Sequence, residues 1–166
     1  VDASDALGVE DLRAFYDEVG GTCAWDDVSA SRFISLAQSA GDQGLDPALF
    51  HADRLSGGFS QDAARRDTLL TDAAIKYAVA MARGLIYQPP AKIDQAAGSL
   101  PNSGIIRNLA TALARDEVVP WLESLAPQTR AYSRLKDALA FYRSIAAAGG
   151  WEQMPAALAG KRKSRH

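Results

Sequence analysis

The chain has 166 residues, of which 48% are hydrophobic and 23% charged, and a net charge of −2. These are ordinary proportions for a globular domain, and no run of 18 apolar residues occurs that would span a bilayer. The charge is uneven, because residues 161–166 carry +4 and residues 1–160 therefore carry −6. An acidic body argues against a nucleic-acid groove, which needs a coherent basic face.

Helical periodicity begins near the N-terminus and is broken by glycine pairs. The first apolar stripe predicts a helix that Gly20-Gly21 ends, with apolar positions at Val9, Leu12, Phe15, Tyr16 and Val19. A second stripe predicts a helix that Gly41 and Gly44 end, with apolar positions at Phe33, Leu36, Ala37 and Ala40. Residues recurring at three- and four-residue intervals form one face of a helix.

Asp46 and Pro47 predict the start of a short third helix. Asp is a favoured N-cap and Pro is favoured at the first helical position, so we expect this helix to run to about Leu55. The longest predicted helix covers residues 67–83, with Gly84 as its C-cap. Its apolar face consists of Leu70, Ala74, Tyr77 and Met81.

The second half of the chain starts with an irregular arm, residues 88–102, rich in turn formers. A stripe at Ile106, Leu109, Ala110 and Leu113 follows, and then a short segment, 119–125, with Pro120 near its start. The last predicted helix carries Tyr132, Leu135, Leu139, Tyr142 and Ala146 on one face, and Gly149-Gly150 end it. No convincing alternating strand is present.

These patterns predict an all-α fold. We expect a single compact bundle of about six to seven helices with irregular connecting arms. The predicted domain covers residues 1–160, and residues 161–166 form a short basic tail.

Candidates for catalysis are few. The chain has two histidines, His51 and His166, so a Ser–His or Cys–His pair would depend on His51, which we interpret as a partly exposed helix position. Carboxylates near Cys23 work against a thiolate, so we expect Cys23 to be a small packed residue beside Trp25. Ser133 and Lys136 have the serine-x-x-lysine spacing, but the accompanying motifs of those enzymes are missing. We expect no catalytic residue, no metal site and no cofactor.

The candidate binding residues lie in connectors and in the tail. Trp25, Tyr87 and Trp151 fall outside the apolar stripes, where an aromatic side chain either seals a core edge or forms a binding rim. Sealing is the commoner outcome, and both remain open here. The tail bases, which would attract an anionic surface weakly, are Lys161, Arg162, Lys163 and Arg165.

Four segments in order carry a family resemblance: 12–25 (LRAFYDEVGGTCAW), 40–55 (AGDQGLDPALFHADRL), 69–86 (LLTDAAIKYAVAMARGLI) and 125–151, which ends in AAAGGW. Together they resemble the N-terminal scaffold region of the large, YcbB-like L,D-transpeptidases of Gram-negative bacteria, over roughly residues 10–155. In that family a peptidoglycan-binding module and a catalytic domain with a Ser-His-Gly-Cys-type motif follow. Cys23 lies in Thr-Cys-Ala instead, so no catalytic residue is carried over.

The resemblance implies a non-catalytic periplasmic scaffold or binding domain that acts with peptidoglycan-remodelling enzymes, after removal of a signal peptide. The implied partner is a cell-wall enzyme or another periplasmic protein, with peptidoglycan itself as a further possibility; no nucleic acid and no membrane span are expected. The competing readings are an N-terminal fragment of a full L,D-transpeptidase and a structural adaptor of an envelope secretion or export complex. The short basic end favours a free-standing domain.

Overall fold

The computed structural model describes residues 3–57, 62–84 and 102–151, and these residues form helices and no strand. The predicted all-α class is confirmed. The chain divides into two compact units, Val1–Thr129 and Arg130–His166. The predicted division at residue 160 stays a prediction, because residues 152–166 lie outside the described part. The predicted irregular arm, residues 88–102, also lies outside the described part except for its last residue, Asn102.

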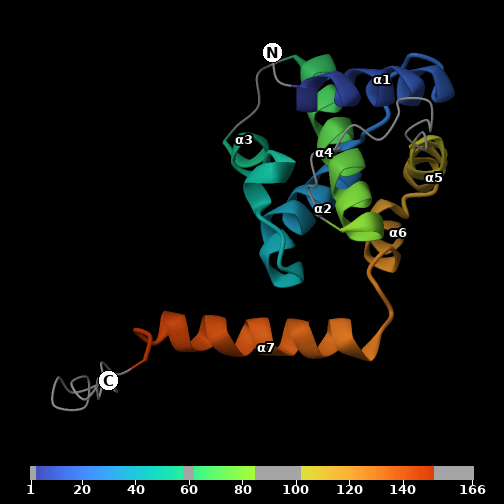
Figure 1. Cartoon of the computed structure of the whole chain (residues 1–166). Helices are drawn as coiled ribbons and strands as arrows, with labels where there is room; N and C mark the ends of the chain where they lie inside the picture. The colour runs from blue at the N-terminus through green and yellow to red at the C-terminus, as the bar shows by residue number, and fades with distance from the viewer. Residues whose placement is uncertain (1–2, 58–61, 85–101, 152–166) are drawn as a thin grey trace, which may run out of the picture. The chain divides into compact units, whose positions relative to one another are not determined.

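The first unit contains six α-helices and two short 3-10 helices in its described residues. They are α1 (Ala3–Glu18), α2 (Asp27–Gln38), η1 (Ser39–Gln43), η2 (Pro47–Phe50), α3 (Ala52–Ser56), α4 (Ala63–Arg83), α5 (Ser103–Ala114) and α6 (Val118–Ser124). Helix α4 runs through the middle of this unit and contacts α1, α2, α5, α6 and η2 (Figure 1). It is the element around which the others pack.

Helix α4 confirms the longest predicted helix and extends it at the N-terminal end. It starts after Asp62, whose carboxylate accepts hydrogen bonds from the backbone N–H groups of Ala64 (3.1 Å) and Arg65 (3.3 Å). The predicted face is buried at all four positions, Leu70, Ala74, Tyr77 and Met81. Gly84 ends the helix at φ +80° and donates to the Ala80 carbonyl at 2.8 Å, as expected of a C-cap glycine.

The core of the first unit is aromatic at its centre. The ring of Tyr77 lies 5.1 Å from that of Phe50 and 6.4 Å from that of Phe33, both in edge-to-face geometry. Phe15 of α1 is fully buried in the same cluster. Alanines on α4, such as Ala73 and Ala74, are also fully buried and allow neighbouring helices to approach closely. Residues of the stripes predicted on α1, α2, α4 and α5 therefore meet in one core, although Val9 at the start of the first stripe is 65% exposed.

The third predicted helix forms as two pieces. Asp46 caps it by accepting from the Ala48 N–H at 3.0 Å, and Pro47 takes the first helical position, as predicted. His51, however, has φ +54°, a left-handed conformation that interrupts the helix between η2 and α3. Histidine is one of the residues that visit this region more often than most. No sequence pattern here indicated the break.

The second unit contains α7 (Arg130–Ala147), which confirms the last predicted helix. Gly149 (φ +101°) and Gly150 (φ +84°) end it, and Gly150 donates to the Ile145 carbonyl at 2.9 Å. None of the residues of α7 is buried. Leu135 is 69% exposed, so the apolar stripe that the sequence shows lies open in this unit.

Candidate functional site

A buried carboxylate organises the connection between α1 and α2. Asp67, on α4, is 3% exposed. Its Oδ1 accepts from the backbone N–H groups of Ala24 (2.8 Å) and Trp25 (2.9 Å), and its Oδ2 accepts from the Tyr16 hydroxyl at 2.6 Å. Buried charge is costly unless it is hydrogen-bonded. With three donors, Asp67 fixes the turn before α2 onto α4.

The neighbouring Thr71 completes this network. It is fully buried and accepts from the Trp25 indole Nε1 at 3.0 Å, while the Tyr16 hydroxyl lies 3.4 Å from its Oγ1. Burial, together with the hydrogen bond to Asp67, raises the pKa of Tyr16 to about 12. The hydroxyl therefore stays protonated and acts as a donor. The network serves as a structural clamp.

The same clamp explains why Cys23 is not where the sequence suggested. The prediction that Cys23 packs beside Trp25 is wrong, because Cys23 is exposed. Gly20 and Gly21, both at φ +73°, reverse the chain after α1. The N–H groups of Ala24 and Trp25, the two residues after Cys23, then turn inward and donate to Asp67. The Cys23 thiol is left outside.

His51 forms the second polar cluster, with two residues of α4. Its Nε2 lies 2.7 Å from Asp72 Oδ2, and the Lys76 ammonium lies 2.7 Å from the same oxygen. A carboxylate can only accept, so Nε2 carries the proton. Lys76 Nζ also lies 3.4 Å from Nε2, but a protonated Nε2 cannot accept a hydrogen bond. Lys76 therefore donates to Asp72. This arrangement anchors the left-handed turn at His51 to α4.

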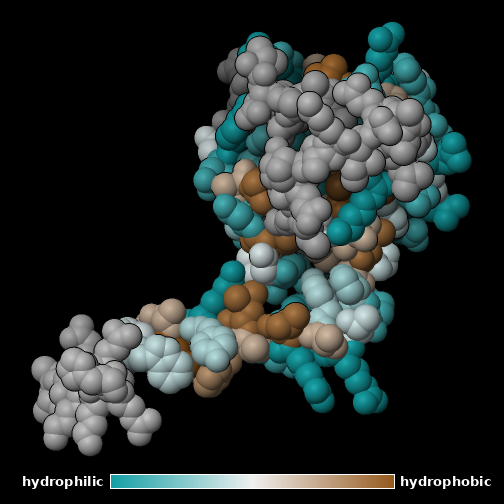
Figure 2. All heavy atoms as spheres, viewed as in Figure 1, coloured by the Kyte–Doolittle hydropathy of each residue, from teal (hydrophilic) through white to brown (hydrophobic). Residues whose placement is uncertain are grey.

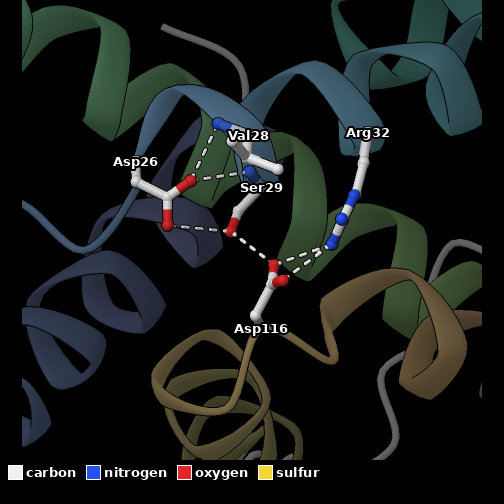
Figure 3. A network of polar contacts seen from close by, with 5 residues as sticks. All are labelled: Asp26, Val28, Ser29, Arg32 and Asp116. Atoms are coloured by element: carbon white, nitrogen blue, oxygen red, sulfur yellow. Dashed lines mark hydrogen bonds and ion pairs between the residues drawn. The ribbon is translucent and has the colours of Figure 1, made fainter.

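The third polar cluster joins α2 to the corner between α5 and α6 (Figure 3). The guanidinium of Arg32 donates to both carboxylate oxygens of Asp116, at 2.9 and 2.8 Å, and the Ser29 hydroxyl donates to Oδ1 at 3.3 Å. Asp116 has φ +55°, a left-handed conformation that Asp tolerates better than most residues. The corner is thereby tied to α2 at a position with unusual backbone geometry.

Asp26 extends the same network at the start of α2. Its carboxylate accepts from the backbone N–H groups of Ser29 (2.7 Å) and Val28 (2.8 Å). Hydrogen bonding from the Ser29 N–H, the largest contribution, holds the pKa of Asp26 below its usual value. The acidic pair Asp26-Asp27 is therefore divided between two tasks: Asp26 caps a helix, and Asp27 accepts from Arg66 at 2.6 Å.

A groove of about 530 Å³ opens beside the Arg32–Asp116 pair, between α2 and α6. Each side of the groove is lined by one row with spacing i, i+3, i+4, i+7: one row follows α2 to its C-cap, Ser39, and the other starts at Asp116 in the corner before α6 and continues along α6. The rows are Arg32, Ser35, Leu36 and Ser39 on one side and Asp116, Val119, Pro120 and Glu123 on the other. The apolar members are Leu36, Val119 and Pro120, and charged and hydroxyl groups surround them. This composition is typical of a binding groove for a mixed apolar and polar segment.

Of the sequence-predicted binding residues, the structure describes Trp25 in the first unit and Trp151 in the second. Trp25 is half-buried, lies 5.3 Å ring to ring from Phe33 and packs against the core, so it seals the core edge. Trp151 is 72% exposed after the two glycines that end α7. Tyr87 and the tail bases Lys161, Arg162, Lys163 and Arg165 lie outside the described residues. A binding role for these residues stays a prediction.

The residues that shape the groove and the clamp were not identified from the sequence. Asp67 carried a signal, since it stands one turn before Leu70 and Thr71 on the apolar stripe, where a carboxylate needs partners. Arg32 and Asp116 carried none, because they lie 84 residues apart.

Within the described ranges, no group of three or more His, Cys, Asp or Glu side chains is arranged to hold a metal ion.

Comparison with known families gives one match. A family model described as a Scaffold domain matches residues 10–139, which covers the described helices from the middle of α1 into α7. No curated protein and no solved structure matches the chain.

Proposed function

The chain belongs to the Scaffold domain family, and from this we propose that it is a non-catalytic binding domain that holds a cell-wall enzyme in the periplasm. The partner would be a peptidoglycan-remodelling enzyme of the L,D-transpeptidase class. The four segments that resemble the scaffold region of those enzymes support this assignment, since three of them fall inside the matched range and the fourth overlaps it.

The observation that carries the proposal is the groove between α2 and α6. Its two rows of side chains lie on α2 and α6 and their ends, and the Arg32–Asp116 ion pair bridges them. Apolar members with charged and hydroxyl side chains beside them suit a segment of a partner protein, because the apolar contacts supply binding energy and the polar groups supply orientation. Three acidic networks, around Asp67, Asp72 and Asp116, are each engaged in holding helices in place.

Peptidoglycan is a weaker candidate than a protein partner. It is rich in carboxylates, and residues 1–129 hold 18 acidic and 10 basic residues, a net charge of −8. Like charges repel, and salt only reduces that repulsion. We expect a version that ends at Gly160, which carries −6, not to pellet with isolated sacculi at moderate salt, and its pelleting would contradict this part of the proposal.

The direct test fills the groove. Ser35 is exposed and stands in the α2 row of the groove, so Ser35→Trp places an indole ring where the partner segment would lie. We expect this variant to bind a purified L,D-transpeptidase at least tenfold more weakly than the unchanged chain, in a biosensor titration. The physical reason is that the indole ring takes up the space that the partner segment would occupy.

Ser124→Trp is the matched control. Ser124 is an exposed serine on α6 that is outside the groove-lining rows, so the same substitution adds the same surface without filling the groove. Equal affinities for the two variants would overturn the groove as the binding site. Absence of binding by the unchanged chain to any transpeptidase tested would overturn the choice of partner.

A further inference from the structure

We propose that α7 docks flat on an anionic lipid surface through its apolar face. This surface is separate from the groove and does not depend on the proposed function. Within the described residues no helix is long and apolar enough to cross a bilayer, so the interaction would be interfacial. Three observations support it: exposure, the width of the apolar face, and the positions of the charges.

The apolar face of α7 is exposed and aromatic. Leu135 is 69% exposed, Phe141 59% and Tyr142 58%, and Leu139 and Ile145 are half-buried on the same side. In Figure 2, hydrophobic surface follows the visible side of α7 with hydrophilic surface beside it. Most helical stability in proteins comes from packing of an amphipathic face, and α7 buries no residue, so this helix gains stability from a surface that covers the face.

The apolar face is wide. At 100° per residue, positions from Phe141 to Tyr132 span roughly half of the helix circumference. A helix that binds in a protein groove commonly uses a narrower row of anchors at i, i+3 or i+4, and i+7. A broad apolar face with aromatic residues and a basic polar side is instead typical of a helix that lies in a membrane interface.

The charges border the apolar face on both sides. Arg130 and Arg134 lie along the Phe141 edge, and Lys136 and Arg143 lie along the Tyr132 edge. The single acid, Asp137, gives α7 a net charge of +3. Long basic side chains beside an apolar face extend their charged ends toward headgroups while the stems cover apolar surface. An anionic lipid layer would attract the basic side chains on both edges of the apolar face at once.

Pairing of α7 with α7 of a second copy is disfavoured by the same charges. Two such helices would bring +3 against +3, and their flanking positions would place bases opposite bases. Trp151, 72% exposed just after the helix, adds an aromatic side chain of the type enriched at membrane interfaces.

The test uses the full chain with lipid vesicles. We expect co-sedimentation with vesicles of phosphatidylcholine containing phosphatidylglycerol, and little with phosphatidylcholine alone. Arg134→Gln combined with Lys136→Gln removes two charges from opposite edges, and each is worth about fivefold near an anionic membrane, so binding should fall about 25-fold. Leu135→Ser combined with Phe141→Ser should abolish it, because the apolar contact is lost.

Matched controls come from the first unit. Arg13→Gln combined with Arg107→Gln removes two exposed bases outside α7, and Leu49→Ser removes a 45% exposed leucine. Both should leave vesicle binding unchanged, and a version ending at Gly160 should retain it. The proposal is overturned if the α7 variants bind like the unchanged chain, if binding disappears with the tail alone, or if the unchanged chain ignores phosphatidylglycerol. If the chain forms dimers without lipid, and Leu135→Ser combined with Phe141→Ser converts them to monomers, the apolar face is assigned to a second copy instead.

Discussion

The two units of the chain use similar amphipathic helices in opposite ways. In Val1–Thr129, apolar faces meet in a core where Phe15, Phe33 and Tyr77 are fully buried, and the unit carries a net charge of −8. In Arg130–His166, the apolar face of α7 is exposed, and eight bases against two acids give +6. The net charge of −2 for the whole chain conceals this contrast between a unit with a buried core and a unit with an exposed apolar face.

This contrast teaches that periodicity and burial are separate properties. A 3.6-residue pattern shows which face of a helix is apolar, but not what covers that face. Helix α4 and helix α7 read alike in the sequence, and each carries a tyrosine in the middle of its stripe. The tyrosines Tyr77 and Tyr142 therefore allow a direct comparison of the two units.

The largest expected effect comes from that pair. Tyr77→Ala removes a fully buried ring that contacts Phe33 and Phe50, and we expect it to lower the free energy of unfolding by about 3–5 kcal/mol. Tyr142→Ala should change it by less than about 0.5 kcal/mol, since that side chain is 58% exposed. Urea denaturation followed by circular dichroism measures both. Equal losses would contradict the division into a packed and an open unit.

A second pair compares carboxylates. Asp67→Asn removes the charge that accepts from Tyr16, Ala24 and Trp25, and we expect a loss of about 2 kcal/mol, the scale of hydrogen bonds to a buried charged group. Asp137→Asn, on exposed α7, should leave stability nearly unchanged. If Asp67→Asn were as stable as the unchanged chain in the same denaturation assay, the clamp would not hold the turn before α2.

A smaller effect is expected at the start of α4. Asp62→Ala removes the side chain that accepts from the N–H groups of Ala64 and Arg65, and the loss of such an N-cap typically costs about 1 kcal/mol. Asp62→Asn should recover most of the loss, because its side-chain oxygen can still accept. Thermal denaturation of the two variants distinguishes capping from an effect of charge, which both substitutions would share.

The smallest effect is a pH dependence of the first unit alone. The folded-state pKa of Tyr16 is about 12 and its ordinary value is 10.0. A raised pKa means that the contribution of Tyr16 to stability is complete below pH 10 and is lost as the pH rises through 12. We expect Tyr16→Phe to reduce the slope of stability against pH in this window. An unchanged slope would show that the Tyr16 hydroxyl does not titrate between these values.

Much of the fold could be predicted because local signals were strong. The Asp46-Pro47 start, the Gly84 stop and the buried face of α4 all follow from capping and periodicity within a few residues of sequence. The break at His51 and the exposure of Cys23 could not be predicted, since each depends on contacts with α4 from another part of the chain.

The candidate site was less predictable than the fold. The groove depends on Arg32 and Asp116, which are brought together only by the packing of α2 against α6. The aromatic residues that the sequence singled out are exceptions to the apolar stripes, whereas most residues that line the groove lie at regular positions of α2 and α6. A search for unusual residues therefore finds exposed connectors more readily than it finds a surface between two regular helices.

The clamp at Asp67 also determines when parts of the chain become ordered. Its hydrogen bonds join residues 42 to 51 positions apart, so they form only after a long loop has closed. The backbone hydrogen bonds of α7 span one helical turn and form within about a microsecond. Hydrogen exchange should invert the usual order: the amides of Ala24 and Trp25, which lie outside any helix in the connection between α1 and α2, exchange slowly, whereas those in the middle of α7 exchange rapidly.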